Sequence, residues 1–136
     1  DMISKLNRIE AIVLEVEKRS PLVVLEDKDK LKERISELLD KDISIDEDRI
    51  TSEVVIFTDK SNINEEIVRL KSHVKQFLSI LDEKDSVGRK LDFLIQEMNR
   101  EINTIGSKAN DMLISQNVVE IKSELEKIRE QVQNVE

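Results

Sequence analysis

The only histidine of this 136-residue chain, His73, follows Glu66 by seven residues. In a helix this spacing is close to two turns and puts both side chains on one face. An imidazole and a carboxylate placed in this way predict a site for a divalent metal, or a base and an acid. The same spacing also suits a histidine packed between helices and hydrogen-bonded to a carboxylate, so both interpretations remain open.

Glu97 and Glu101 form a second candidate pair, because residues four apart share a helix face. Two stacked carboxylates could hold Mg²⁺ or Mn²⁺ through bound waters. Glutamates at this spacing are also common on solvated surfaces, and Glu97 is within reach of Arg100 for an ion pair. The pair is therefore a candidate metal site with an ordinary alternative.

Three expected helices carry a polar stripe outside their apolar stripe. The stripes combine Arg, Gln, Asn and Ser, whose hydrogen-bonding groups suit a phosphate, a ribose or a partner helix. The alternative is a set of surface residues and hydrogen bonds between helices. The members are Asn62, Glu66, Arg69, His73 and Gln76; Arg89, Gln96, Arg100, Asn103 and Ser107; and Lys122, Glu126, Arg129 and Gln133.

The helices that position these polar stripes are predicted from apolar residues, which recur at alternating spacings of three and four. This periodicity predicts amphipathic helices, and four such helices can bury their apolar stripes against one another. We therefore expect an all-α protein, an antiparallel helical bundle or a coiled-coil-like arrangement. The four stripes are Ile3, Leu6, Ile9, Val13 and Val16; Ile63, Ile67, Leu70, Val74, Phe77 and Leu81; Leu91, Ile95, Met98, Ile102 and Ile105; and Val118, Ile121, Leu125, Ile128, Val132 and Val135.

Helix boundaries are predicted from capping residues and breaks. Ser20 and Pro21 suit the N-cap and first position of a new helix, so the first helix should end there and a second should run to about residue 40. Residues 42–48 read as a polar connector, and residues 49–59 as a helix, although V-V-I-F within them is strand-like. Further starts are predicted at Ser61 or Asn62, at Asp85 or Ser86, and at Ser115, with Gly106 inside a helix.

Composition excludes several classes of protein. The absence of cysteine excludes disulfides, zinc-thiolate sites and thiol nucleophiles. Thirty acidic against 22 basic residues give a net charge of −8, which argues against a broad basic surface for nucleic acid, and stacking aromatics are nearly absent. No Walker A, glycine-rich dinucleotide or H-E-x-x-H motif occurs. Short apolar runs and no signal-like segment predict a soluble, cytoplasmic protein without a membrane span.

Three segments resemble the C-terminal region of the YicC/YloC family. They are N-E-E-I-V-R-L-K-S-H at 64–73, V-G-R-K-L-D-F-L-I-Q-E-M-N-R-E-I-N-T-I-G-S-K-A-N-D at 87–111, and the terminal helix at 118–136. The resemblance divides the chain into a helical hairpin lead-in, residues 1–45, and a conserved C-terminal helical domain, residues 46–136. Family members are about twice as long and carry an N-terminal domain that this chain does not include.

The resemblance implies a stress-associated bacterial endoribonuclease. Such proteins cleave single-stranded RNA with a divalent metal, Mg²⁺ or Mn²⁺, and assemble into ring-like homo-oligomers such as hexamers. Alternatively, this part of the protein is a non-catalytic module for oligomerisation or RNA positioning. Carried over by position, the catalytic and metal-binding candidates are Glu66, His73, Glu97 and Glu101. The RNA-binding candidates are Arg69, Arg89, Gln96, Arg100, Asn103, Ser107, Lys108, Lys122 and Arg129.

Overall fold

The computed structural model describes residues 1–39, 47–83 and 88–135. Within these ranges the chain forms five helices and no strand, which confirms the all-α prediction and the helix expected over residues 49–59. The helices are α1 (Met2–Leu39), α2 (Glu47–Lys60), α3 (Asn64–Leu81), α4 (Gly88–Lys108) and α5 (Met112–Val135).

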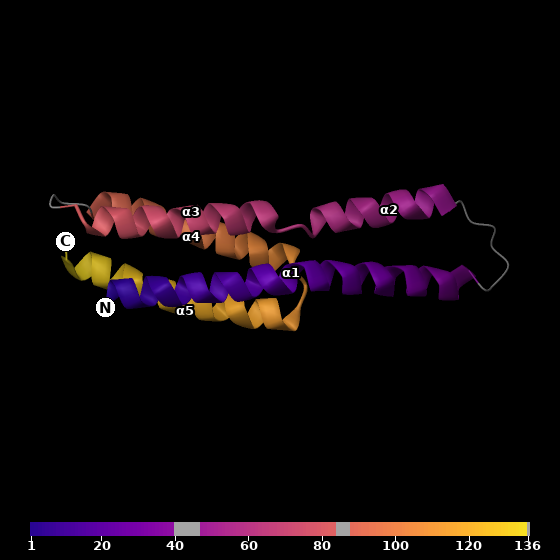
Figure 1. Ribbon diagram of the computed structural model, residues 1–136, viewed down its shortest axis with the longest axis horizontal. Coiled ribbons are helices and arrows are strands. Elements are labelled where there is room, and N and C mark those ends of the chain that lie inside the picture. The colour runs from indigo at the N-terminus through magenta and orange to yellow at the C-terminus, as the bar shows by residue number, and fades with distance from the viewer. Residues whose placement is uncertain (40–46, 84–87, 136) are drawn as a thin grey trace.

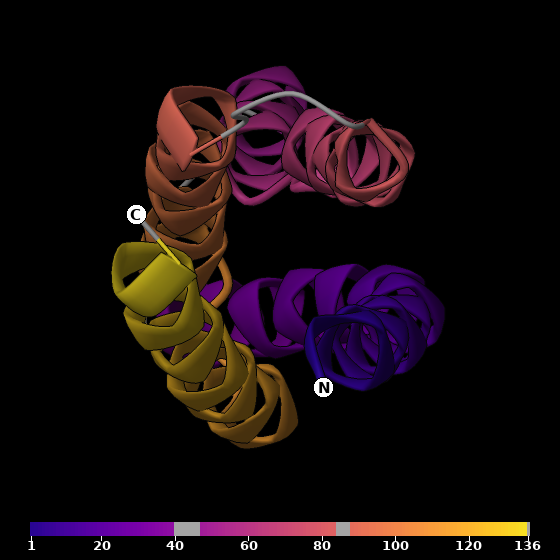
Figure 2. The ribbon, with the colours of Figure 1, turned by 90° about the vertical axis from the view of Figure 1, so that its left-hand side faces the viewer.

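Four helices form an antiparallel bundle. Helix α4 packs between α3 and α5, while α1 packs on α5 and α3 and so closes the group. Helices α1 and α4 run in one direction and α3 and α5 in the other (Figure 1), and the end view shows the four arranged around a common centre (Figure 2). The second half of α1 continues beyond the bundle, where α2 packs on it (Figure 1). We call this extension, residues 22–39 with α2, the arm.

The core consists of the predicted apolar stripes. The stripe residues from Leu6 to Val16, Ile63 to Phe77, Leu91 to Ile105 and Val118 to Val132 are buried against one another, and Leu81 is half-buried beside them. Burying a large aliphatic side chain contributes about 1.5–3 kcal/mol, so this core is the main source of stability. Ile3 was predicted in the first stripe, but it is 49% exposed, and Met2, four residues before Leu6, packs against the core in its place.

The break predicted at Ser20–Pro21 is wrong, because α1 continues through Pro21 as a single helix. Proline removes one backbone hydrogen bond and normally ends or bends a helix. Here the buried face continues across it, since Ser20 and Val23 extend the line of Val16 into the core. Arg19 also joins the two sides of the proline by donating to both carboxylate oxygens of Glu26, at 3.2 and 2.9 Å.

Two predicted helix starts also need correction. Helix α5 begins after Asp111, whose Oδ2 accepts a hydrogen bond from the Ile114 N–H at 3.1 Å, so Ser115 is not the cap and lies inside the helix. At α3 the N-cap position is Ile63, and Asn62 Oδ1 accepts from the Asn64 N–H at 2.9 Å. Residues 42–46 of the predicted connector and the predicted start at 85 or 86 lie outside the described residues, whereas residues 47 and 48 of that connector belong to α2.

Gly106 lies within α4, as predicted, where α4 approaches α5. A methyl group at this position would lie 3.4 Å from Val118 Cγ1, which is ordinary van der Waals contact. The glycine therefore accompanies a close approach but is not required by it. No helix among the described residues is long and apolar enough to cross a membrane.

Asp111 also joins α5 to α1 through Arg19. The guanidinium donates from Nε to Asp111 Oδ2 at 3.2 Å and from a terminal nitrogen to Oδ1 at 3.0 Å. These hydrogen bonds hold the pKa of Asp111 below its ordinary value, although partial burial acts in the opposite direction. One carboxylate thus caps α5 and links it to the helix that carries Pro21.

Substitutions at Asp111 should separate its two roles. Asp111→Asn keeps an oxygen for the cap and loses the ion pair, whereas Asp111→Ala loses both and should cost about 1 kcal/mol more in unfolding free energy. Folding lowers the pKa of Asp111. The unfolding free energy lost in Asp111→Asn should therefore be present near pH 7 and should shrink as the pH falls through that lowered pKa. Urea unfolding at several pH values measures this. Equal stability of the two variants would contradict the capping role.

Candidate functional site

The polar stripe of α3 faces α4, where the two helices meet in what we call the α3–α4 seam. Apolar residues such as Leu70 and Met98 fill the inner side of this contact. Toward the outer side the contact becomes polar and includes two buried glutamates, Glu66 on α3 and Glu101 on α4. Charged residues are almost never fully buried without a partner, so the partners of these two determine what the seam can do.

His73, Glu97 and Glu101 come together in the seam. Each offers one potential ligand atom, and the three atoms lie within 4.8 Å of one another. Glu97 and Glu101 are one turn apart on α4, and α3 brings the imidazole to them from the facing helix. Spacing had suggested two separate pairs, His73 with Glu66 and Glu97 with Glu101. The structure brings His73 together with Glu97 and Glu101, and Glu66 is not part of this group.

The ring of His73 is oriented by its own helix. Its Nδ1 lies 3.3 Å from Gln76 Oε1, one turn further along α3. In the tautomer that carries its hydrogen on Nδ1, this contact is a hydrogen bond to the amide oxygen, and Nε2 retains a lone pair. Histidines that bind metals commonly donate their other ring N–H in this way.

Glu66 has a different environment. Its side chain is 3% exposed, and Oε1 accepts a hydrogen bond from Lys108 Nζ at 2.6 Å, with a terminal nitrogen of Arg69 at 3.8 Å. Burial raises the pKa of Glu66, but the hydrogen bond and charge of Lys108, with Arg69, outweigh it, and the pKa lies below its ordinary value. Oε2 is buried without a hydrogen-bond partner among the described residues.

Arg69 connects the two buried glutamates. Its Nε donates to Glu101 Oε1 at 2.9 Å, and this hydrogen bond is the main reason that the pKa of Arg69 is raised. Lys108, Glu66, Arg69 and Glu101 therefore form one alternating series of charges along the seam. Glu101 thus belongs both to this charge series, through Oε1, and to the group with His73 and Glu97.

The other RNA-binding candidates lie on exposed faces, apart from this series. Arg100 is 74% exposed and lies 3.7 Å from Glu97, as the sequence suggested. The pKa of Arg129 is raised chiefly by its hydrogen bonds to Glu126, within α5. The remaining candidates with exposed side chains are Arg89, Gln96, Asn103 and Ser107 on α4 and Lys122 on α5.

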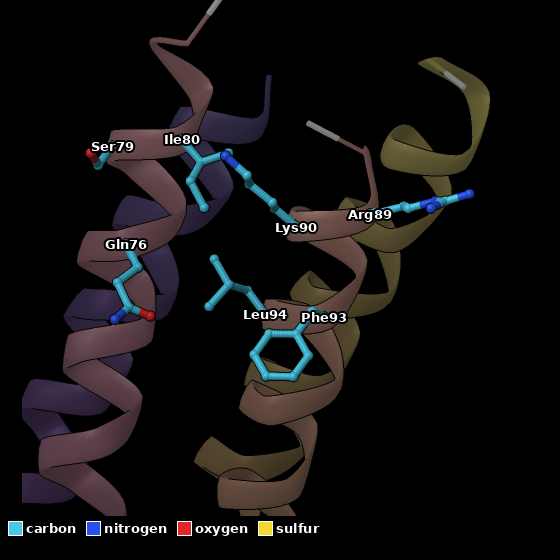
Figure 3. Close-up of a pocket in the computed structure, with 7 residues that line it drawn as sticks. All are labelled: Gln76, Ser79, Ile80, Arg89, Lys90, Phe93 and Leu94. Atoms are coloured by element: carbon cyan, nitrogen blue, oxygen red, sulfur yellow. The ribbon is translucent and has the colours of Figure 1, made fainter. Parts of the chain in front are cut away.

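A pocket of about 520 Å³ adjoins the seam at the end nearest His73 (Figure 3). Gln76, Ser79 and Ile80 line it from α3, and Arg89, Lys90, Phe93 and Leu94 from α4. Phe93 is 60% exposed and is not among the residues predicted for the site. Its position on the helix could have indicated this residue from the sequence, because Phe93 is a large apolar side chain that falls outside the buried stripe of α4.

Comparison with known proteins shows the family of the chain. Residues 16–136 match the family described as "Endoribonuclease YicC-like, C-terminal". The chain belongs to this family. It is 61% identical over 122 residues to "Probable endoribonuclease YicC" of Clostridioides difficile (strain 630), covering 90% of this chain and 42% of the relative.

A second relative with the same description, from Haemophilus influenzae (strain ATCC 51907 / DSM 11121 / KW20 / Rd), is 36% identical over 132 residues, covering 95% of this chain and 45% of the relative. The chain therefore spans less than half the length of these two YicC relatives. The resemblance to the C-terminal region of the YicC/YloC family is confirmed. The division into residues 1–45 and 46–136 stays a prediction.

Removing the partner of Glu66 should destabilise this YicC-like domain in a pH-dependent way. Lys108→Met leaves a buried carboxylate with a weaker partner and should cost about 1–3 kcal/mol near pH 7. In the wild type, folding lowers the pKa of Glu66 below its ordinary value of 4.5, so the ionised carboxylate stabilises the folded state at pH values above 4.5. The difference in unfolding free energy between Lys108→Met and the wild type should therefore grow as the pH rises from 4 to 7.

Denaturant unfolding of both proteins across this range tests the expectation. Lys127→Met, which removes an exposed lysine 3.6 Å from Glu124 on α5, is the matched control and should change stability little. A constant gap between Lys108→Met and wild type at every pH would contradict the role of the Lys108–Glu66 pair.

Proposed function

We propose that the chain is the C-terminal domain of an endoribonuclease that cleaves single-stranded RNA with a divalent metal held by His73, Glu97 and Glu101. One observation carries the proposal: the ligand atoms of these residues come within 4.8 Å of one another in a chain of a family described as endoribonuclease-like. The relatives named as probable endoribonucleases support RNA as the substrate.

The chemistry of the three donors favours Mn²⁺ over Mg²⁺. Mg²⁺ prefers oxygen ligands and keeps several waters, whereas Mn²⁺ also accepts an imidazole beside carboxylates. Once bound, such an ion lowers the pKa of a coordinated water and neutralises charge on a phosphate oxygen. Glu101 can contribute through Oε2, because its Oε1 already accepts from Arg69.

The surrounding residues have separate tasks in this proposal. Arg100, on the exposed side of Glu97, is placed to hold a phosphate by charge-assisted hydrogen bonds. Glu66 and Lys108 act as positioning residues, because they set the charge around Arg69 and thereby the placement of Glu101. The partial exposure of His73 and Glu97 leaves a path for the RNA backbone.

Cleavage of labelled single-stranded RNA by the full-length protein tests the function. Chelation should abolish cleavage, and Mn²⁺ should restore it at least as well as Mg²⁺. His73→Ala and Glu97→Gln should each lower the rate by about 100-fold or more, because each removes a donor from the group.

The matched control is Glu15→Gln, an exposed glutamate on α1, which should cleave at the wild-type rate. Calorimetric titration with Mn²⁺ provides a second measurement, and both site variants should bind the ion more weakly. Full activity in both His73→Ala and Glu97→Gln would show that the proposed site is wrong.

A second function, self-association through the arm, is favoured by exposed apolar residues. The arm carries six large apolar side chains that are exposed, and a contiguous apolar surface commonly marks an interaction site. We propose a second copy of the chain as the occupant, which agrees with an oligomerisation role. The residues are Leu22, Leu25, Leu38, Val55, Ile56 and Phe57, each between 41% and 66% exposed.

Light scattering on the full-length protein tests this assembly. We expect a mass above that of one chain. Val55→Glu should lower this mass, because burying an unpaired charge in an apolar contact costs free energy. The control Val119→Glu places the same charge on an exposed position of α5 and should leave the mass unchanged. A monomer at every concentration measured would contradict the assembly role.

A further inference from the structure

We propose that the pocket beside the α3–α4 seam is a nucleobase subsite in which Phe93 stacks on one base of a single-stranded RNA. The inference rests on the proposed RNA function and adds to it the residue that receives a base. It also assigns a role to the one large aromatic side chain on the exposed surface of α4.

Phe93 has the exposure that a stacking platform needs. Its side chain is 60% exposed, whereas Leu94 beside it is 4% exposed and belongs to the core. Figure 3 shows the ring beside Leu94, facing the space between the two helices. An aromatic face on a surface otherwise rich in charge is the feature on which bases stack in proteins that bind single strands.

The pocket has the size and polarity for a base. Its volume of about 520 Å³ lies within the range of small-molecule sites, and Ile80 and Leu94 provide apolar walls. The side chains of Gln76 and Ser79 stand on the α3 side (Figure 3). Gln76 Oε1 lies 3.3 Å from His73 Nδ1, so this polar residue of the pocket also contacts the candidate metal group.

Two cations lie at the same end of the seam, although the whole chain has a net charge of −8. Lys90 extends from α4 toward Ile80 and pairs with Glu83 at 3.1 Å, whereas Arg89 points away from the pocket (Figure 3). Arg89 has no hydrogen-bond or ion-pair partner among the described residues and is therefore available to a phosphate. The cation that extends across the pocket is therefore Lys90, and Arg89 could hold only a part of the strand that leaves the pocket.

The pocket is continuous with the candidate metal group. Gln76 lines the pocket and also contacts the His73 ring, and Phe93 lies one helical turn before Glu97 on α4. A nucleotide whose base stacks on Phe93 therefore has its phosphate near His73 and Glu97. This placement makes Phe93 a residue that sets which phosphate is cleaved.

Binding of RNA to the full-length protein, with chelator present to prevent cleavage, tests the subsite. A short fluorescent single-stranded oligoribonucleotide is compared with an abasic ribose-phosphate oligomer of the same length and charge. The wild type should bind the base-bearing strand about 5- to 150-fold more tightly, the range for one stacked base. Phe93→Leu, which keeps an apolar side chain without a π-face, should lose most of this preference.

Two further variants act as controls. Phe93→Trp should keep or strengthen the preference, because it preserves stacking. Leu113→Ala removes another exposed apolar side chain, 52% exposed on α5, and should bind as the wild type does. Because Phe93 is exposed, none of its substitutions opens the core, which thermal melts monitored by circular dichroism will check. No preference for the base-bearing strand, or a preference unchanged in Phe93→Leu, overturns the proposal.

Cleavage assays keep this inference separate from the proposed function. If cleavage depends on His73 and Glu97 while Phe93→Leu keeps the wild-type base preference, the subsite is wrong and the nuclease function stands. If the base preference depends on Phe93 but no RNA is cleaved, the subsite stands and the nuclease function is wrong.

Discussion

The burial of two carboxylates, Glu66 and Glu101, where α3 packs on α4 constrains the rest of the site. A buried charge is tolerated only with a partner, and each glutamate has one cation within 2.9 Å, Lys108 for Glu66 and Arg69 for Glu101. Because Lys108 and Glu101 come from α4 and Glu66 and Arg69 from α3, the charges fix how the two helices face each other. The apolar stripes hold the helices together, and the polar stripe determines their register.

The fold could be predicted because apolar periodicity reports a single physical requirement, the burial of one helix face. Errors arose where a local preference competed with that requirement. Pro21 predicts a helix start on its own, but the buried line through Ser20 and Val23 and the contact between Arg19 and Glu26 continue the helix across it. Asp111 precedes the last helix in the sequence, and its capping role becomes apparent only with its partners, Ile114 and Arg19.

The site could be predicted only in part. Helical angles placed His73 on a polar stripe, and the spacing of four paired Glu97 with Glu101, but spacing within one helix cannot show which faces of different helices meet. Glu66 shares a helix face with His73, yet its interactions are with Lys108 and Arg69. Phe93 was missed for a related reason, because a single aromatic residue carries no periodic signal and its significance comes from the pocket between two helices.

The bond between Arg69 and Glu101 links the structural and the proposed catalytic roles of the seam. An ion held by His73, Glu97 and Glu101 would add positive charge beside Arg69, so it would weaken the attraction of the arginine for Glu101. Arg69 still has Glu65 and Glu66 within 3.8 Å, and it can shift toward them without losing every partner. Glu66, with one buried oxygen lacking a partner, would gain most from that shift. The buried charge series would thus compensate for the ion, so that Glu101 could remain a structural residue and also act as a ligand in the proposed site.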